Sequence, residues 1–245
     1  MMKLLISGAC GRMGRLIAQE APGFGFEVAG GIDPNAGVFA AFPIFPSFAD
    51  VRAEAQVLID FSSPLTLPGL LAFAGERKLP CVLGTTGFTP EDMEAIRKAA
   101  EGIPIFQSPN MSRGVYVLRQ LAAQAARMLP GFDIEIVEKH HNQKAESPSG
   151  TALSLMDAVK NDQSIPVVGR NGKDAKRSPN DIGIHSVRGG TVTGDHEIGF
   201  YGSHEVITLI HQAQSRAIFA AGALSAAAWL IGKKPGLYGM EDLMG

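Results

Sequence analysis

Cysteine is scarce in this chain of 245 residues, which contains only Cys10 and Cys81. Two cysteines cannot form a disulfide framework or, unaided, a cysteine zinc site, and such scarcity is typical of a protein of the reducing cytosol. Cys10 lies in a glycine-rich loop and Cys81 begins a predicted buried strand. We interpret both as small apolar side chains, which argues against a thiol enzyme.

Long apolar segments are also missing. The longest uncharged stretch, 217–231, is rich in Ala and Gly and is bounded by Arg216 and Lys233. It is shorter than the roughly 20 residues that a membrane span requires. Only about four apolar residues precede the glycines of the N-terminal segment, too few for the core of a signal peptide. We therefore expect a soluble cytoplasmic protein in which 217–231 is a buried helix.

No excess charge of one sign is present, since 22 Lys and Arg residues face 24 Asp and Glu residues, for a net charge of −2. This balance gives no electrostatic reason to expect a nucleic acid or an anionic membrane as a partner. Hydrophobic residues make up 45% and charged residues 19% of the chain. These values are close to the globular average and exclude a charge-rich disordered chain.

The first 110 residues alternate short apolar runs with helical segments. Runs without polar alternation are typical of strands buried on both faces, as in a parallel sheet covered by helices. The apolar runs are 3–7, 27–32, 57–61, 80–84 and 103–107, and helical spacing covers 12–20 and 90–101. The repeated order of strand, helix and strand predicts a Rossmann-like, doubly wound α/β domain.

The pattern changes after Asn110. A helix is predicted over 114–128, and apolar and acidic residues then alternate over 132–136, as in a strand with one exposed face. A helix over 151–160 and glycine-punctuated strands over 185–213 predict a second, α+β domain with a mixed or antiparallel sheet. We therefore expect two domains, one formed by 1–111 with 215–245 and the other by 112–214.

Three glycines, Gly8, Gly11 and Gly14, occupy the turn between the first predicted strand and the first helix. Glycine lets the backbone approach a pyrophosphate, and the helix N-terminus offers N–H groups and positive potential to it. The spacing is G-x-x-G-x-x-G, because Cys10 stands where the commoner fingerprint has its second glycine. An ordinary tight turn is the alternative, but the strand before the loop and the helix after it favour a dinucleotide site.

Asp33 ends the second predicted strand, 25 positions after Gly8. An acidic residue at this place can accept hydrogen bonds from the adenosine ribose hydroxyls, and its charge repels a 2′-phosphate, which favours NADH. Arg12 favours NADPH instead, because a guanidinium at the loop can hold that phosphate. Alternatively, Asp33 is only a turn former in the sequence DPNAG.

Two further loops follow predicted strands, GTTG at 84–87 and SPNMS at 108–112. Ligands of open α/β sheets collect at the carboxyl ends of the strands. We expect both loops to line the nicotinamide half of the cofactor, although either could be an ordinary connection.

The segment EKHHNQKAESPSGTA is the most chemically loaded part of the chain. His140 and His141 end a strand, and Lys144 follows in a loop. Ser149 or Thr151 can cap the next helix, whose N–H groups form an anion site. Together these groups suit a substrate with carboxylates, and a histidine can donate a proton near neutral pH. The alternatives are a surface histidine, a solvated lysine and a helix start without a ligand.

Zinc hydrolysis is another use of histidines that we considered. The chain has six histidines and two His-Glu pairs, 196–197 and 204–205, but no H-E-x-x-H sequence. Alternation over 204–213 places its histidines at individual strand positions without a shared ligand face. No metal site is predicted.

Taken together, these motifs resemble the bacterial dihydrodipicolinate reductase family. The resemblance is carried, in order and over nearly the whole chain, by GACGRMG, GTTGF, SPNMSRGV, E-x-H-H-x-x-K-x-x-x-P-S-G-T-A, GDHEIGF, HEVITLIHQAQSRAIFAAGAL and PGLYGMEDLM. The HHxxK and PSGT block is specific to the family, unlike the glycine loop. The chain departs from the family at Glu146-Ser147, where Asp-Ala is usual, and at Met111, where an aromatic residue is common. Asp33 is followed by Pro34 and not by a basic residue, which favours NADH.

The resemblance implies an NADH- or NADPH-dependent oxidoreductase of lysine and diaminopimelate biosynthesis that is homotetrameric and joined through the sheet of its second domain. It implies that 1–111 and 215–245 bind the dinucleotide and that 112–214 binds a small dicarboxylate. His140 would be the proton donor and Lys144 a second donor that also steadies the substrate. The implied carboxylate-binding residues are His141, Lys144, Ser149, Gly150 and Thr151. The implied cofactor-binding residues are Gly8, Ala9, Cys10, Gly11, Arg12, Met13, Asp33, Gly84, Thr85, Thr86, Ser108, Pro109, Asn110 and Met111.

Two other functional classes remain open from the sequence. One is a different two-domain nicotinamide oxidoreductase, such as a sugar or semialdehyde dehydrogenase. The other is a non-enzymatic dinucleotide-sensing module, which would bind the cofactor but would be indifferent to the loss of His140 and Lys144.

Overall fold

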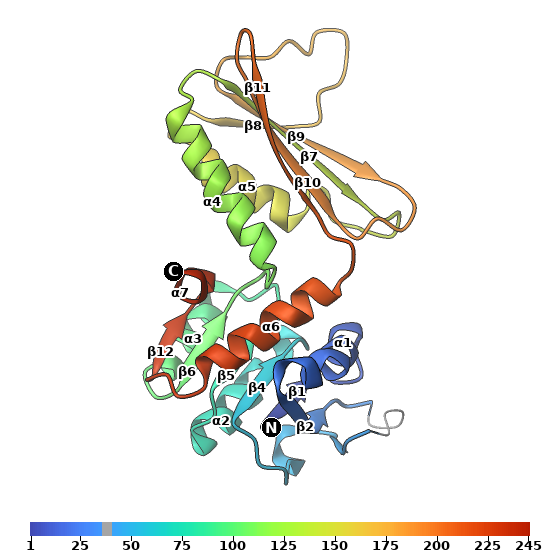
Figure 1. The fold of residues 1–245 in the computed structure, drawn as a ribbon, viewed down its shortest axis with the longest axis vertical. Helices are drawn as coiled ribbons and strands as arrows, with labels where there is room; N and C mark the ends of the chain where they lie inside the picture. The colour runs from blue at the N-terminus through green and yellow to red at the C-terminus, as the bar shows by residue number, and fades with distance from the viewer. Residues whose placement is uncertain (36–40) are drawn as a thin grey trace. The chain divides into compact units, whose positions relative to one another are not determined.

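The structure is a computed structural model that describes residues 1–35 and 41–245, and it divides into two compact units (Figure 1). The first unit contains Met1–Arg113 and Arg216–Gly245, and the second contains Gly114–Ser215. Helix α6 (Ala217–Leu230) therefore belongs to the first unit, where it packs on helix α1 (Arg12–Glu20) and on the central strands. What each unit binds remains a prediction.

The first unit is built on a sheet in which seven strands of the described chain run parallel in the order β12-β6-β5-β4-β1-β2-β3. The strands are β1 (Met2–Ser7), β2 (Phe26–Ile32), β3 (Ile44–Phe45), β4 (Val57–Asp60), β5 (Cys81–Leu83), β6 (Pro104–Gln107) and β12 (Gly236–Tyr238). The chain turns to one side of β1 for β2 and β3 and crosses to the other side for β4. Ligands of open α/β sheets bind at this reversal. The predicted Rossmann-like, doubly wound fold is confirmed.

Helices cover both faces of this sheet, which is why its strands are continuous apolar runs. Helices α1 and α6 pack together on one face. On the other, α2 (Leu67–Arg77) and α3 (Pro90–Ala100) bury Leu70, Phe73 and Ile96 in one cluster with the strands. The remaining short helices of this unit are η1 (Ala21–Phe24), η2 (Phe48–Asp50), η3 (Pro64–Thr66) and α7 (Met240–Met244).

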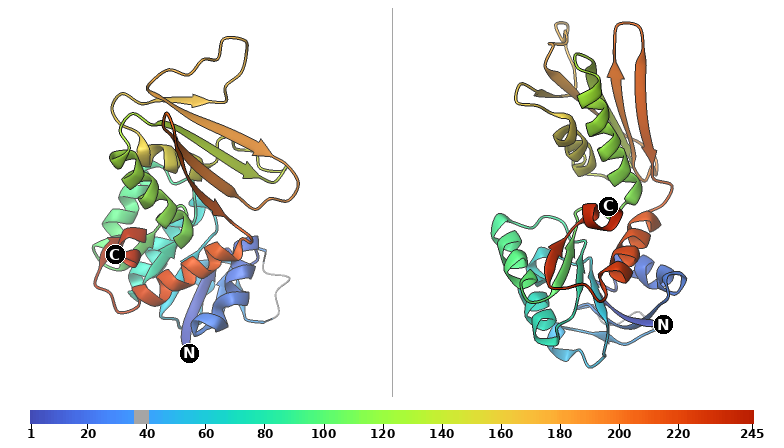
Figure 2. Two further views of the ribbon diagram at one scale, coloured as in Figure 1. Left: turned by 45° about the horizontal axis from the view of Figure 1, so that its top comes forward. Right: turned by 60° about the vertical axis from the view of Figure 1, so that its left-hand side comes forward.

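The second unit contains a sheet in which five strands of the described chain have the order β11-β10-β7-β9-β8. They are β7 (Asp133–His140), β8 (Ile165–Val168), β9 (Asp181–Arg188), β10 (Asp195–Tyr201) and β11 (Val206–Gln212). Strand β7 is parallel to β9 and antiparallel to β10, so the sheet is mixed, as predicted. Helices α4 (Arg113–Met128) and α5 (Gly150–Val159) pack on one face of this sheet (Figure 2). Ile136, Ile184 and Ile198 are buried in the core on this face.

The face of this sheet opposite α4 and α5 is called the open face below. Side chains alternate between the faces of a strand, so Glu135 and Val137 lie on the open face while Ile136 and Glu138 point into the core. Glu135 forms ion pairs with Arg170 and Arg177, and its Oε2 lies 2.8 Å from Nε2 of His185. Apolar side chains are also exposed on the open face, among them Val187, Val206 and Ile210.

The elements that the sequence analysis missed include α2, β3, β8, β12 and α7. Helix α2 contains Pro68, Gly69 and Gly75, which are weak helix formers. Strand β8 is mostly exposed and β12 has three residues, so neither carries a clear apolar pattern. Within the described ranges, no helix is long and apolar enough to cross a membrane.

Candidate active site

The carboxyl ends of the parallel strands bring the predicted cofactor loops to one edge of the first sheet. Ser7, Ile32, Asp60, Leu83 and Gln107 are the last residues of five neighbouring strands, and neighbours among them are register partners. The loops that follow them include the glycine loop, residues 33–35, the GTTG loop and the SPNMS loop. All the predicted cofactor residues therefore lie at this edge.

The glycine loop is too tightly packed to accept side chains at two of its glycines. Gly8 has a φ of +77°, and a Cβ on it would lie 2.5 Å from the carbonyl oxygen of Phe61. A Cβ on Gly14 would overlap the carbonyl oxygen of Gly8 and lie 2.6 Å from the Cα of Ala9. Gly11 is the N-cap of α1 and offers no side chain to the N–H groups of the first turn. The loop, called the backbone cradle below, is thus packed closely on its own backbone and on that of Phe61, and the first-turn N–H groups of α1 that follow it suit a pyrophosphate.

Asp33 is buried and ties the end of β2 to the glycine loop. Its Oδ2 accepts a hydrogen bond from the Cys10 N–H at 3.0 Å, and its Oδ1 accepts one from the Asn35 N–H at 2.9 Å. The second contact is a local turn contact, and the rest of the predicted turn sequence extends beyond the described residues. Each carboxylate oxygen can accept a further hydrogen bond. The turn and ribose interpretations of Asp33 are therefore compatible.

The other residues of the glycine loop differ in exposure. Ala9 is buried, Cys10 and Met13 are half-buried, and Arg12 is exposed. Burial, and next the charge of Asp33, raise the pKa of the Cys10 thiol, which keeps it protonated.

The GTTG loop is anchored by a buried carboxylate that the sequence did not single out. Thr85 Oγ1 donates to Asp60 Oδ2 at 2.6 Å, Ser62 Oγ donates to Asp60 Oδ1 at 2.5 Å, and the Ser62 N–H donates to Thr85 Oγ1 at 2.9 Å. A Cβ on Gly84 would overlap the ring of Phe61. Burial raises the pKa of Asp60, against the hydrogen bonds from Ser62 and Thr85. Its position at the end of an apolar strand was the available signal. Thr86 is exposed.

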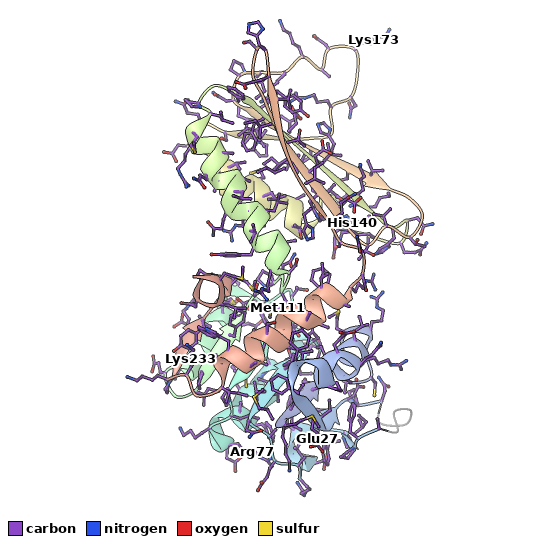
Figure 3. The ribbon with its side chains drawn as sticks, viewed as in Figure 1. Glu27, Arg77, Met111, His140, Lys173 and Lys233 are labelled. Carbon is purple, nitrogen blue, oxygen red and sulfur yellow. The ribbon has the colours of Figure 1, made fainter. Side chains whose placement is uncertain are left out.

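The SPNMS loop is held by its own polar groups. Ser108 Oγ donates to the Asn110 carbonyl at 2.8 Å, and Asn110 Oδ1 accepts from the Ser112 N–H at 2.8 Å. Met111, labelled in Figure 3, is buried, and its carbonyl faces Gly222 of α6, where a Cβ would overlap it. Pro109 is exposed.

In the second unit, His140 ends β7 and contacts a buried carboxylate. His140, labelled in Figure 3, is 8% exposed. Its Nδ1 lies 2.5 Å from Oε2 of the fully buried Glu138. Arg188 of β9 forms a fork on Glu138, with Nη1 donating to Oε2 and Nη2 to Oε1, each at 2.7 Å. The Ser149 N–H donates to Oε1 at 3.1 Å. Glu138 and Arg188 were not among the predicted site residues, although Glu138 stands in the E-x-H-H motif.

The charges of this cluster set the protonation of His140. Burial opposes the ionisation of Glu138, but the hydrogen bonds, first among them that from Arg188, outweigh it and lower the pKa of Glu138 to about 2. Burial lowers the pKa of His140, Glu138 opposes this, and the charges of Lys144 and Arg188 add to the lowering. His140 therefore gives up its proton more readily than an ordinary histidine in the absence of a ligand.

Ser149 is the residue that caps α5, which decides between Ser149 and Thr151. Its Oγ accepts from the Ala152 N–H at 3.2 Å and lies 3.0 Å from Nε2 of His196. His196 is buried, and its ring meets that of His140 edge-on at 5.2 Å between centroids. Burial, and next the charge of His140, lower the pKa of His196 to about 4. His196 was missed, although it lies in the GDHEIGF motif.

The remaining predicted residues of the second unit lie in the first turn of α5 or in the loop before it. Lys144 Nζ forms an ion pair with Oε2 of Glu146 at 2.7 Å, and the Glu146 side chain is 77% exposed. His141 Nδ1 accepts from the Gln143 N–H at 3.2 Å. The first turn of α5 contains Gly150, which is exposed, and Thr151, which is half-buried. Because Glu146 is exposed, its ion pair with Lys144 is weak, and Lys144 is available to another carboxylate.

The first unit has the fold of a nucleotide-binding domain, with a glycine loop at the reversal of a parallel sheet. The second unit carries an acid–base cluster. A chain with both features belongs to the class of NAD(P)H-dependent oxidoreductases. Residues 2–111 match the family model described as dihydrodipicolinate reductase, N-terminus. Residues 114–244 match dihydrodipicolinate reductase, C-terminus. The chain belongs to the dihydrodipicolinate reductase family.

Individual relatives agree with this assignment. The 4-hydroxy-tetrahydrodipicolinate reductase of Caldanaerobacter subterraneus subsp. tengcongensis is 49% identical over 252 residues, which cover 100% of this chain and 98% of the relative. The enzyme of the same name from Clostridium tetani is 41% identical, with coverages of 100% and 97%.

Solved structures share the fold. The dipicolinate-bound dihydrodipicolinate reductase from Paenisporosarcina sp. TG-14 has a TM-score of 0.81 at 24% identity and covers 99% of each chain. A myo-inositol dehydrogenase from Corynebacterium glutamicum ATCC 13032 has a TM-score of 0.62 at 16% identity, with coverages of 96% and 90%. The combination of a Rossmann-like domain with a second domain is thus common to several dehydrogenases.

Proposed function

We propose that this protein reduces (2S,4S)-4-hydroxy-2,3,4,5-tetrahydrodipicolinate to tetrahydrodipicolinate with NAD(P)H, in lysine and diaminopimelate biosynthesis. The observation that carries the proposal is the cluster of His140, Lys144 and the start of α5 in a chain of this family. The full-length relatives bear the name of this reaction.

Substrate binding requires two anion sites, because the substrate carries two carboxylates. The first-turn N–H groups of α5, at Gly150 and Thr151 beyond the Ser149 cap, supply one site. Lys144 and His141 supply the other, with the substrate carboxylate replacing Glu146 as the partner of Lys144. A dicarboxylate is therefore the ligand class that these groups recognise.

Proton transfer is the role of His140. Loss of water from the 4-hydroxy compound gives a conjugated imine, and its reduction at C4 builds electron density on the nitrogen and C3. His140 donates a proton to this system, and the Lys144 ammonium stabilises the developing charge and is a second donor. A positioned acid of this kind contributes about 10²–10⁴-fold to the rate.

Cofactor binding is assigned to the edge of the first sheet, where the tightly packed turn at Gly8 and Gly14 leads into the N-terminus of α1, whose N–H groups can bind a pyrophosphate. Gly8–Met13 would hold the phosphates, Asp33 the adenosine ribose, and 84–86 with 108–111 the nicotinamide half. The reduced nicotinamide, when bound, supplies the hydride. NADH is favoured over NADPH, because the Asp33 carboxylate repels a 2′-phosphate and Pro34 offers it no cation.

A homotetramer is expected from the family resemblance. The open face of the second sheet is the surface that we assign to subunit contacts, because it exposes Val206, Ile210 and other apolar side chains.

The test is a coupled assay in which a synthase makes the substrate from pyruvate and aspartate semialdehyde, and the oxidation of NADH or NADPH is followed by absorbance. We expect oxidation with both cofactors and faster oxidation with NADH. If neither cofactor is consumed, the protein is a different nicotinamide oxidoreductase.

A pair of variants tests the role of Lys144. Lys144→Ala should lower turnover strongly without changing the dissociation constant of the dinucleotide, because Lys144 belongs to the second unit. Lys160→Ala is the matched control, since Lys160 also pairs with an acidic neighbour, Asp157, but lies at the other end of α5. Equal losses of turnover and dinucleotide affinity in Lys144→Ala would count against the assignment. Cofactor binding without any effect of Lys144 or His140 substitutions would indicate a sensing module.

A further inference from the structure

We propose that Glu138, held by Arg188, is the positioning residue for His140, and that it fixes the imidazole with Nδ1–H toward the carboxylate and Nε2 as the nitrogen that exchanges a proton with the substrate. The inference rests on the proposed function, in which His140 is the proton donor.

The contacts of Glu138 leave its carboxylate no freedom to turn. Oε2 faces His140 Nδ1 and Arg188 Nη1, while Oε1 accepts from Arg188 Nη2 and the Ser149 N–H. Four donors thus converge on the two oxygens from β7, β9 and the start of α5. The side chain is fully buried, so water cannot replace any of these partners without opening the core.

The charge of Glu138 decides which ring nitrogen of His140 carries a proton. Four donors, two of them from one guanidinium, favour the ionised carboxylate. The hydrogen bonds from Arg188 and His140 are among the contacts that lower the pKa of Glu138 to about 2 against the effect of burial. An ionised carboxylate only accepts hydrogen bonds. Nδ1 of His140 must therefore carry the hydrogen in both charge states of the ring, and Nε2 is the site of protonation and release.

The other side of the ring is restrained as well. A Cβ on Gly194 would lie 3.0 Å from Nε2 of His140, so the chain passes close to this nitrogen without covering it by a side chain. The ring of His196 stands edge-on to that of His140 at 75°. Between Glu138, Gly194 and His196, the imidazole has one well-defined orientation.

The charged and titratable groups that act on His140 come from every neighbouring element. Glu138 lies on its own strand, Arg188 on β9, His196 on β10, and Lys144 and Glu146 in the loop before α5. Glu138 is the group that favours protonation of His140, while burial, Lys144 and Arg188 oppose it. Removal of the Glu138 charge should therefore make His140 a weaker base as well as a misplaced one.

The first experiment uses the unchanged protein. In 15N spectra of histidine-labelled protein, with the His140 signals identified by their loss in His140→Gln, we expect the neutral ring to carry its hydrogen on Nδ1. Free imidazole side chains carry it mainly on Nε2, so the two forms are distinguishable. A neutral His140 with Nε2–H would overturn the proposal without the need for any variant.

The second experiment uses Glu138→Gln and Arg188→Lys, with Glu135→Gln as the matched control. Glu135 lies on the same strand and also pairs with arginines and a histidine, but it faces the opposite side of the sheet. We expect Glu138→Gln to lower kcat about 10- to 100-fold, less than the roughly 10²–10⁴ that a positioned acid contributes in full, with a smaller change in KM. The pH at which His140 titrates should move down in Glu138→Gln and not in Glu135→Gln.

Two further measurements separate positioning from a structural role. Glu138→Asp keeps the charge and should recover part of the lost kcat and of the titration shift. Glu138→Gln should cost little more in a His140→Gln background, because residues that act as a unit are not additive. Full additivity, or a fall in kcat with unchanged His140 tautomer and titration, would overturn the proposal.

The outcomes distinguish this inference from the proposed function. If the unchanged protein has no reductase activity, the proposed function fails and the 15N spectra still test the Glu138 contact. If it is active and depends on His140, but Glu138→Gln keeps the same kcat and pH profile, only the positioning role fails. Should Glu138→Gln not fold, because Arg188 is left without a partner, the spectra of the unchanged protein and of Arg188→Lys decide.

Discussion

Gly14→Ala should disrupt the first unit and its dinucleotide site, although alanine is normally the better residue in a helix. Gly14 lies inside α1, where replacing glycine by alanine ordinarily stabilises by roughly 1 kcal/mol. Here a Cβ would overlap the carbonyl oxygen of Gly8 and lie 2.6 Å from Ala9 Cα and 2.7 Å from its carbonyl oxygen. These are backbone atoms of the cradle, so no side-chain rotation can relieve the overlap.

The magnitude follows from setting these effects against each other. Overpacking of a dense site costs typically about 1–3 kcal/mol and occasionally more. Because the overlap involves backbone atoms, we expect the upper part of that range to apply and to exceed the propensity gain, for a net loss of about 2 kcal/mol in the free energy of unfolding. The cradle must also shift, so the dissociation constant of NADH should rise by at least about tenfold, the equivalent of roughly 1.4 kcal/mol.

Gly75→Ala is the matched control, because Gly75 is also within a helix of the first unit but a Cβ on it would meet nothing within 4 Å. It should stabilise by about 0.5–1 kcal/mol and leave NADH binding unchanged. Urea unfolding and NADH fluorescence titrations measure both quantities. If Gly14→Ala is as stable as Gly75→Ala and binds NADH normally, the prediction that the backbone at Gly14 leaves no room for a Cβ is contradicted.

Three further predictions concern the other charged groups. Asp33→Asn should lower the ratio of kcat/KM for NADH to that for NADPH, because the charge that repels a 2′-phosphate is gone; an unmoved ratio would leave Asp33 as a turn residue only. Binding of dipicolinate at pH 7 should take up protons, because its two carboxylates oppose the lowering of the His140 pKa by burial. Calorimetry in buffers of different ionisation enthalpy measures this uptake, which His140→Gln should abolish. A binding enthalpy that does not depend on the buffer would refute the prediction. Burial lowers the pKa of His196 from 6.5 to about 4, so the unfolded chain binds the proton first and stability should fall by roughly 3 kcal/mol between these pH values. His196→Gln should flatten that part of the urea-unfolding profile, and an equally steep profile in this variant would contradict the assignment.

Local patterns sufficed for the nucleotide-binding domain. Strands buried on both faces are apolar runs in the sequence, and these runs predicted the doubly wound sheet. Gly8 and Gly14 lie where two backbone segments approach closely, so the glycine spacing predicted the loop. The HHxxK and PSGT block likewise predicted the family. Weak or short signals were missed, as in α2 with its Pro68 and glycines.

The groups that control the candidate site came only from the tertiary structure. Arg188 lies 50 positions from Glu138 and reaches it because β7 and β9 pair in parallel, while Thr85 lies 25 positions from Asp60 and reaches it across β4 and β5. Sequence periodicity shows which face of a strand a residue occupies, but not which strand lies beside it or in which register. The sequence thus determined which residues can take part in proton transfer and ligand binding. The pairing of distant strands decided which carboxylates are buried and charged, and which of those residues they contact.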